Sequence, residues 1–218
     1  MATRCAPESG AWTSLALAAA LLCVAMPALG ASKSAEHVLE AEPPEVVERL
    51  MDQNLLVLEA VGKGRESFIV AYVIFERSVQ DVLGLLRQAN RQTEYRPELD
   101  SVETIRKFEN GRIDEQRIRI VFTKFVYRLR YRDVADTDGR LEWTLDPEFD
   151  NDMVHFEGFW EFYPFAEDAN RTLARFGSNV DIGPAVPRFI QRGMSRKTVL
   201  RYLENSRLWI DSDGEWRP

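Results

Sequence analysis

The stretch that decides the fold runs from Ile182 to Trp209 and reads IGPAVPRFIQRGMSRKTVLRYLENSRLW. Pro187 suits the first turn of a helix, because its φ is already helical and its missing N–H would be unpaired there. No proline interrupts the rest of the stretch. Apolar residues recur at steps of three and four, so they share one helical face. They are Val186, Phe189, Ile190, Gly193, Met194, Leu200, Leu203 and Leu208. We predict one helix, about 35 Å long at a rise of 1.5 Å per residue.

The opposite face of this predicted helix is polar. It carries Arg192, Arg196, Arg201, Glu204 and Asn205. A continuous apolar stripe needs an apolar surface to pack against. Two arrangements would provide this surface. One is a sheet that wraps around the helix, and the other is a compact core in which this is an ordinary amphipathic helix.

The first thirty residues have the pattern of a secretory signal. An almost entirely apolar run from Ala11 to Leu29 ends in small residues at Ala28 and Gly30. We expect residues 1–30 to be a signal peptide cleaved after Gly30, and the protein to be periplasmic or secreted. The alternative is a retained membrane anchor, for which the apolar run is short.

Cysteine usage and net charge limit the kinds of site. Both cysteines, Cys5 and Cys23, lie in the signal segment, so the mature chain would hold neither a thiol nor a disulfide. The formal net charge is −7, which gives no general attraction for nucleic acid or for an anionic membrane. The sequence has no metal-ligand spacing and no glycine-rich phosphate loop, so we expect no metal site and no cofactor.

The remaining chain reads as one domain with an N-terminal extension. We expect a linker at 31–44, an extension with a short helix and strand at 45–65, the domain itself at 66–210, and a tail at 211–218. Neither an internal repeat nor a composition break divides the domain further.

Seven segments of the domain have strand patterns. They are residues 67–75, 101–108, 112–122, 125–134, 141–145, 154–165 and 172–182. Asn110-Gly111 is a strong hairpin turn, and a shift of apolar parity predicts another turn or bulge at Thr123-Lys124. Ser78 precedes a helical pattern and should cap it. Because consecutive antiparallel strands pair with their neighbours, we predict an α+β fold with a seven-stranded antiparallel sheet and a long C-terminal helix.

Two polar side chains suggest acid–base chemistry. His155 and Glu157 share one face of the strand at 154–165. They could act as an imidazole–carboxylate pair. The alternative is a solvent-facing polar row, and the strand parity favours it, because Val154, Phe156 and the other apolar residues of this strand have the opposite parity.

A row of arginines alternates along the strand at 125–134. It consists of Arg128, Arg130 and Arg132. The row could recognise an anionic headgroup, or it could pair with acids of the next strand such as Glu142 and Asp146.

Four motifs follow one another through the domain. They are residues 73–83 (VIFERSVQDVL), 95–102 (YRPELDSV), 158–164 (GFWEFYP) with Arg171-Thr172 after it, and 181–187 (DIGPAVP). In this order and spacing they resemble the START-like superfamily, also called SRPBCC or helix-grip. It includes polyketide cyclase/dehydrase-like, coenzyme Q-binding and lipid-transfer proteins. The resemblance covers residues 67–209 and implies a curved sheet that grips the C-terminal helix around a cavity for a hydrophobic ligand.

Two features depart from this family. The signal segment is not general in it, and the extension at 45–61 is additional. The resemblance implies that interior side chains line a tunnel, whereas in a filled core they would only pack. The predicted ligand-binding residues are Phe122, Phe125, Tyr127, Tyr131, Trp143, Phe156, Trp160, Phe162, Phe189, Ile190, Met194 and Leu200. No catalytic residue is predicted.

Three functions follow as hypotheses. The first is an exported, non-enzymatic protein that binds a lipid or isoprenoid for carriage or sensing, with transient membrane contact. The second is a cyclase/dehydrase-type enzyme for a polyketide-like substrate, which requires a polar cluster inside the cavity. The third is a ligand-free envelope interaction module that uses the extension. Their order rests on the resemblance of fold, and one fold hosts many functions.

Overall fold

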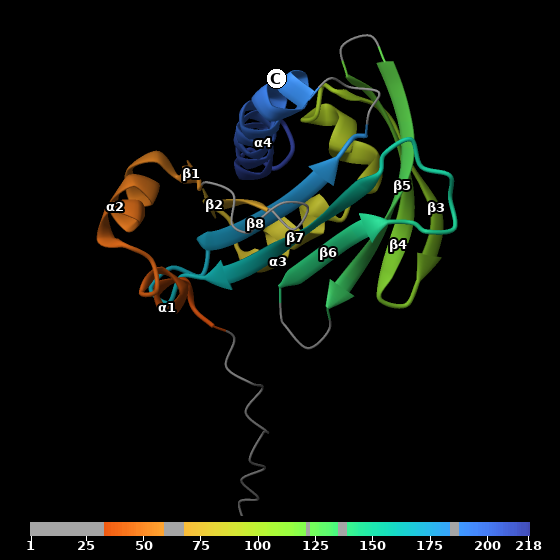
Figure 1. The fold of residues 1–218 in the computed structure, drawn as a ribbon. Helices are drawn as coiled ribbons and strands as arrows, with labels where there is room; N and C mark the ends of the chain where they lie inside the picture. Colours follow the sequence, from red (N-terminus) through yellow and green to blue (C-terminus); the bar gives the residue numbers. More distant parts are fainter. Residues whose placement is uncertain (1–32, 59–67, 121–122, 135–138, 184–187) are drawn as a thin grey trace, which may run out of the picture. The chain divides into compact units, whose positions relative to one another are not determined.

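The computed structural model describes residues 33–58, 68–120, 123–134, 139–183 and 188–218. These residues form an eight-stranded antiparallel sheet in the order β1-β2-β8-β7-β6-β5-β4-β3 (Figure 1). The strands are β1 (Leu55–Val57), β2 (Ile69–Phe75), β3 (Leu99–Phe108), β4 (Gly111–Ile120), β5 (Thr123–Val134), β6 (Arg140–Leu145), β7 (His155–Pro164) and β8 (Thr172–Asp181). The helices are α1 (Ala35–Leu39), α2 (Pro44–Gln53), α3 (Val79–Leu86), the 3₁₀ helix η2 (Ala89–Glu94) and α4 (Arg188–Asp211).

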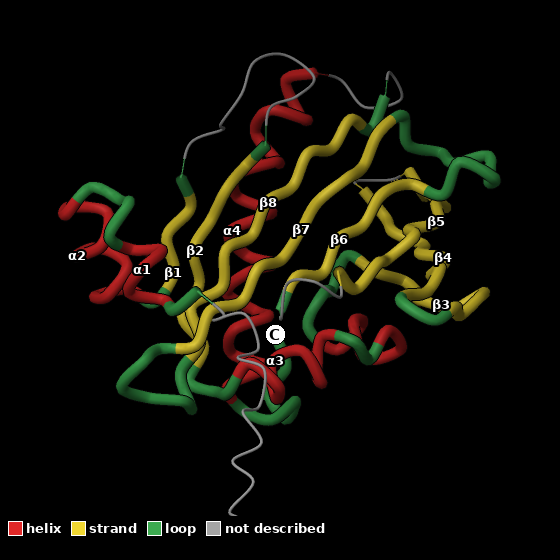
Figure 2. Tube along the Cα trace, turned by 90° about the horizontal axis from the view of Figure 1, so that it is seen from below, coloured by secondary structure: helices red, strands yellow, loops and turns green. Residues whose placement is uncertain are grey.

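The sheet curves, and α4 packs against its concave face (Figure 2). The predicted α+β fold with a long C-terminal helix is therefore confirmed, and so is the sheet that wraps around this helix. The predicted number of strands is wrong by one. Leu56 pairs with Tyr72, so the segment at Leu55–Val57 adds β1 to the free edge of β2. A run of three residues is too short to show an alternation pattern of its own.

The two predicted hairpin turns have different outcomes. A two-residue turn connects β3 and β4 as predicted, but it consists of Glu109 and Asn110, because Gly111 already pairs with Phe108 as the first residue of β4. The turn expected at Thr123-Lys124 is wrong, because both residues pair with the end of β4 as part of β5. The connection there is residues 121–122, which lie outside the described residues.

The capping function predicted for Ser78 is confirmed, because its hydroxyl accepts a hydrogen bond from the Asp81 N–H at 3.2 Å.

Two apolar cores lie on opposite faces of the sheet. The concave core contains fully buried side chains such as Phe75, Trp160 and Leu203. The smaller core on the other face joins α1 and α2 to β1, β2 and β8 through residues that include Leu50 and Tyr72. Strand β2 is buried on both faces, which explains its continuous apolar sequence IVAYVIF.

The linker expected at 31–44 contains a helix. In α1, Ala35 and Leu39 are four residues apart, so both face the sheet and both are buried. Ser34 caps α1, and the Tyr72 hydroxyl donates a hydrogen bond to Glu42 at 2.7 Å. The region 45–65 contributes α2 and β1, and residues 59–65 lie outside the described residues.

The C-terminal half of α4 is held firmly against the rest of the domain. Leu203, Trp209 and Ile210 are fully buried. Asn205, expected on the polar face, is buried as well, and its amide donates to the Tyr95 carbonyl oxygen at 3.0 Å. The helix therefore buries a wider face than its apolar stripe, because the segment after η2 packs beside it. Among the described helices, none combines the length and the apolar character that crossing a membrane requires.

Replacing Glu94 with glutamine should lower the free energy of unfolding at neutral pH by about 1 kcal/mol. Its carboxylate accepts from Arg91 Nε at 3.0 Å and Trp209 Nε1 at 3.0 Å, and it lies 2.8 Å from Arg217 Nη2. The Arg91 hydrogen bond first, and then the Trp209 and Arg217 interactions, hold the pKa of Glu94 below its usual 4.5. A carboxyl with a lowered folded pKa stabilises the fold above the unfolded pKa, and this contribution is lost as pH falls through the folded pKa.

The difference in free energy of unfolding between the wild type and Glu94→Gln should therefore shrink as the pH drops below 4.5. Urea unfolding at about pH 7 and at about pH 3 measures this. A difference in free energy of unfolding of the same size at both pH values would contradict a stabilising role of the ionised Glu94 carboxylate.

Candidate functional site

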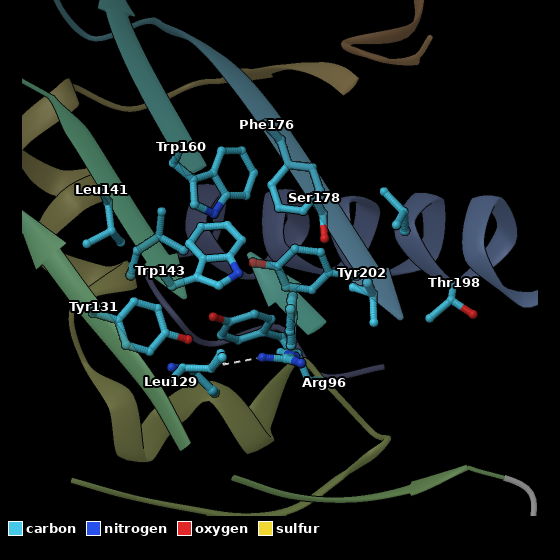
Figure 3. A pocket seen from close by; sticks show the side chains of 16 residues that line it. Arg96, Leu129, Tyr131, Leu141, Trp143, Trp160, Phe176, Ser178, Thr198 and Tyr202 are labelled. Atoms are coloured by element: carbon cyan, nitrogen blue, oxygen red, sulfur yellow. Dashed lines mark hydrogen bonds between the residues drawn. The ribbon is translucent and has the colours of Figure 1, made fainter. Parts of the chain in front are cut away.

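A cavity of about 150 Å³ lies between the concave face of the sheet and α4 (Figure 3). The alternation of β5, β6, β7 and β8 directs every second side chain into it. Its lining consists of Leu86, Gln92, Tyr95, Arg96, Leu129, Tyr131, Leu141, Trp143, Phe156, Trp160, Phe176, Ser178, Val180, Thr198, Val199 and Tyr202. Val180 is 45% exposed, which places one end of the cavity near the surface.

One wall of the cavity is a continuous aromatic cluster. The ring centroids of Trp160 and Phe176 are 4.8 Å apart, and those of Phe176 and Tyr202 are 5.6 Å apart. Aromatic pairs at these separations pack favourably and give a stiff apolar surface. The strands of the sheet and α4 thus both contribute to this wall.

Trp143 occupies its position because of a glycine on the neighbouring strand. Gly158 pairs with Trp143 across β6 and β7, and a Cβ atom at Gly158 would lie 2.2 Å from Trp143 Cζ2. Only glycine therefore leaves room for the indole ring. The indole Nε1 is buried and has no hydrogen-bond partner among the described residues.

The other end of the cavity is polar. Arg96 Nη1 donates to Gln92 Oε1 at 2.9 Å and approaches Gln116 Oε1 at 3.5 Å. Gln116 Oε1 accepts from the Tyr127 hydroxyl at 2.9 Å, and its Nε2 donates to the Tyr131 hydroxyl oxygen at 3.0 Å. The five side chains form one buried hydrogen-bond network, and buried networks of this kind hold their members in fixed orientations.

The charged and titratable members of this network, Arg96, Tyr127 and Tyr131, are all protonated at neutral pH. Arg96 is positively charged, and its Nε lies 3.3 Å from Glu98 Oε1, which offsets the charge. Burial raises the pKa of Tyr127 to about 12 and raises the pKa of Tyr131 above its usual 10. Both phenols therefore keep their protons and do not act as bases. Tyr127 donates its proton to Gln116, so Tyr131 is the phenol of this network that can donate to a ligand.

The structure divides the predicted ligand-binding residues into groups. Four of them line the cavity: Tyr131, Trp143, Phe156 and Trp160. Three others are buried in the same core without lining the cavity: Phe125, Tyr127 and Phe162.

Leu200 is 43% exposed and lies outside the cavity. It is one residue, or about 100°, away from Val199 around the helix. Thr198, Val199 and Tyr202 are the residues of α4 that line the cavity. Phe122 lies outside the described residues, and the side chains of Phe189, Ile190 and Met194 do as well.

Sequence reasoning missed the polar lining of the cavity. Arg96 belongs to a motif that resembles the family, yet nothing local to it predicts that it turns inward. Tyr202 lies three residues after Val199, so helical spacing could have identified it. Gln116 shares strand parity with Ile118, which could have indicated an inward direction, but a polar residue in a strand is more often taken as solvent-facing.

The other polar candidates lie away from the cavity. His155 Nε2 is 3.2 Å from Glu157 Oε1, and their side chains are 43% and 34% exposed.

In the arginine row, Arg130 pairs with Asp146, which follows the end of β6, as the pairing interpretation predicted. Arg128 instead pairs with Glu115 of the preceding strand. Within the described residues, no group of His, Cys, Asp and Glu side chains could hold a metal ion.

Solved structures provide the comparison that bears on this fold. No family model and no curated protein matches the sequence. A STAR-related lipid transfer protein from Xanthomonas axonopodis matches with a TM-score of 0.56 and 15% identity, covering 72% of this chain and 92% of that one. A START superfamily protein from Mycobacterium smegmatis matches with a TM-score of 0.55 and 11% identity, covering 66% and 97%.

The chain has the START-like fold. An aromatase/cyclase, Zhui, from a Streptomyces species shares it with a TM-score of 0.52 and 13% identity, over 67% of this chain and 97% of that one. At these identities the likeness concerns the arrangement of the START-like sheet and its C-terminal helix. It confirms the helix-grip fold that the sequence motifs implied. The START-like fold also accounts for the position of the cavity, since the helix crosses the concave face of the sheet there.

Proposed function

We propose that the protein binds a small hydrophobic molecule in this cavity, with a polar group of the ligand at the Arg96 end. The observation that carries the proposal is the pairing of an aromatic wall with a buried donor network in one space. Binding sites for small molecules characteristically combine mostly apolar walls with a few fixed polar groups. The lipid-transfer protein and the aromatase/cyclase of the same fold support hydrophobic ligands as a class.

The size of the cavity limits what it holds in this conformation. Its volume is about 150 Å³, whereas pockets for drug-sized ligands span about 300–1,000 Å³. An engineered apolar cavity of about 150 Å³ in another protein holds benzene. One ring, or an apolar segment of similar size, therefore fits between the sheet and α4. Burying roughly 200 Å² of apolar surface there would contribute about 5 kcal/mol. A longer ligand would extend past Val180 toward the surface.

A second candidate function is an enzyme of the cyclase/dehydrase type. The observation that favours it is the pair of polar side chains Arg96 and Tyr131 in the cavity lining, which Gln116 joins from behind, because such an enzyme requires polar groups inside its cavity. The protonated phenols point to hydrogen-bond donation rather than proton abstraction, so we place binding first. A polyketide-like substrate that is released with unchanged mass and an unchanged NMR spectrum supports binding alone, whereas a cyclised isomer of the same mass, or a product lighter by one water, supports catalysis.

We propose that binding takes place outside the cytoplasm, after cleavage behind Gly30. The support is the apolar segment with small residues before Ala31. N-terminal sequencing of the protein from the cell envelope tests this. A chain that starts at Ala31 supports export, and a chain that retains Met1 in the membrane fraction contradicts cleavage.

Native mass spectrometry is the test of the proposed function. The mature chain from Ala31 to Pro218, purified from its own cell envelope without detergent, should carry a bound small molecule. Fragmentation of the complex would give the class of the ligand. A bare protein mass that stays bare after incubation with one-ring aromatic compounds would contradict the proposal.

Replacing Ser178 with leucine should weaken binding of a one-ring probe such as acetophenone by at least about tenfold. Ser178 is 7% exposed and lines the cavity, so the larger side chain would occupy the space of the ligand. The free energy of unfolding should change by less than about 1 kcal/mol, because the added carbons fill an existing space. Isothermal titration calorimetry measures the affinity.

The matched control is Thr144→Leu, the same kind of change on the exposed face of β6. It should leave the affinity for acetophenone unchanged. Equal affinity in both variants would mean that the probe binds elsewhere.

A further inference from the structure

We propose that Trp143 is the residue that determines which ligands the cavity accepts. Its indole N–H donates a hydrogen bond to an uncharged oxygen acceptor, such as a carbonyl group, on a ligand about one ring in size. This inference rests on the proposed function and specifies the chemistry of the ligand.

The first support is an unused donor. Trp143 is 6% exposed, and its Nε1 has no hydrogen-bond partner among the described residues. The large majority of buried polar groups in proteins are paired, so each exception calls for an explanation. Figure 3 shows the nitrogen-bearing edge of Trp143 turned toward Tyr202, on the side of the ring that faces the cavity. A ligand acceptor in the cavity would complete this hydrogen bond.

The second support is that Trp143 is held in one orientation. Gly158 lies directly beneath its ring, as described above. Phe156 meets it edge-on with centroids 6.5 Å apart, and Phe176 lies 5.9 Å away. The ring cannot turn to find another partner without displacing these neighbours. A donor fixed in advance binds its acceptor with little further loss of entropy.

The third support comes from the groups around Trp143. Tyr131 is its direct cross-strand partner, and the Tyr131 oxygen already accepts from Gln116, so its proton is available for donation. Arg96 is paired with Glu98, so the cavity does not need an anion to balance its charge. Donors without a net charge favour a neutral carbonyl over either a hydrocarbon or a carboxylate.

The experiment compares two ligands of the same shape. Acetophenone and α-methylstyrene differ only in that C=O replaces C=CH₂. The protein labelled with ¹⁵N in its tryptophan indoles reports each binding event. With acetophenone, the Trp143 indole proton should move downfield, as a newly formed hydrogen bond requires. With α-methylstyrene it should not. The Trp209 indole is already bonded to Glu94 and serves as an internal reference.

The affinities of the two ligands give an independent measurement. Trp143→Phe keeps an aromatic ring and removes the N–H. The ratio of the two dissociation constants should change about fivefold in favour of the hydrocarbon in this variant. If the variant does not fold, the wild-type resonance shifts alone decide the question.

The outcomes separate this inference from the proposed function. If both ligands bind while the Trp143 resonance stays unmoved and the ratio stays constant in Trp143→Phe, this inference is overturned and the binding function stands. If benzoate binds more tightly than acetophenone, the preference for an uncharged acceptor is overturned. If none of these ligands binds, the proposed function fails and this inference with it.

Discussion

Replacing Trp209 with alanine should lower the free energy of unfolding by about 3–5 kcal/mol. Trp209 is fully buried, its ring centroid lies 4.7 Å from that of Tyr95, and the Arg91 guanidinium lies 4.9 Å from it on one side. The change would remove the aromatic contact between α4 and Tyr95, and would leave a space that the packed surroundings cannot fill. Urea unfolding followed by circular dichroism measures the loss.

Trp209→Phe separates packing from hydrogen bonding. It keeps most of the ring but removes the N–H that donates to Glu94 at 3.0 Å. We expect a smaller loss, about 1–2 kcal/mol. Because Tyr95 lines the cavity, Trp209→Ala should also weaken binding of acetophenone, whereas Trp209→Phe should affect it less. If Trp209→Ala lost no more free energy of unfolding than Trp209→Phe, packing of the aromatic ring would not be what holds α4 in place.

Replacing Arg96 with methionine should lower the free energy of unfolding by about 2–3 kcal/mol. The side chains of Arg96 and Glu98 are only 14% and 20% exposed, so the change would leave a carboxylate without its partner in a poorly solvated place. It would also remove the donor to Gln92 and Gln116. Methionine retains the apolar stem, so the loss reports on the guanidinium rather than on volume.

Arg119→Met is the matched control. Arg119 pairs with Asp100 at 3.2 Å, but these side chains are 54% and 41% exposed. A surface pair of this kind contributes about 0–1 kcal/mol. Guanidinium chloride screens charges, so urea is the denaturant of choice for both variants. Equal losses in the two variants would show that the buried network contributes no more than a surface ion pair.

The strands and the long helix were predictable because their signals are local. Alternation in Phe125, Tyr127 and Leu129 places these side chains on one face of β5, and the structure buries all three. Ser78 caps α3 through an N–H only three residues away. Such patterns depend on neighbours within a few residues, so the order of the residues is sufficient to predict them.

The edges of the fold were less predictable. A short strand was predicted in the extension, but its place in the sheet was not: β1 joins the sheet because β2 offers a free edge and α2 leads the chain to it. Helix α1 has only five residues, and it is stable where Ala35 and Leu39 pack against the sheet. An isolated helix of this length would not form in water, because the entropy lost in nucleating a helix exceeds the stabilisation from the hydrogen bonds of a single turn.

The candidate site shows the same division. The aromatic lining at Tyr131, Trp143 and Trp160 was predictable, because strand parity places each of them on the apolar face of its strand. The polar end was not. Arg96 and Gln116 are 20 residues apart, and each belongs to a residue type that is most often exposed. Their inward direction depends on the partners that the fold brings to them.

The sequence by itself determined the α+β class, the meander from β3 to β8 and the long C-terminal helix, whereas the pairing of β2 with β8 was decided by the tertiary structure. These follow from periodicity and caps, which act over a few residues. The tertiary structure alone decided that Glu94 meets Trp209 across 115 positions of the chain, that Gly158 leaves space for Trp143, and that the Trp143 N–H is buried without a partner. The physical reason is that the free energy of a buried polar group depends on which distant groups surround it.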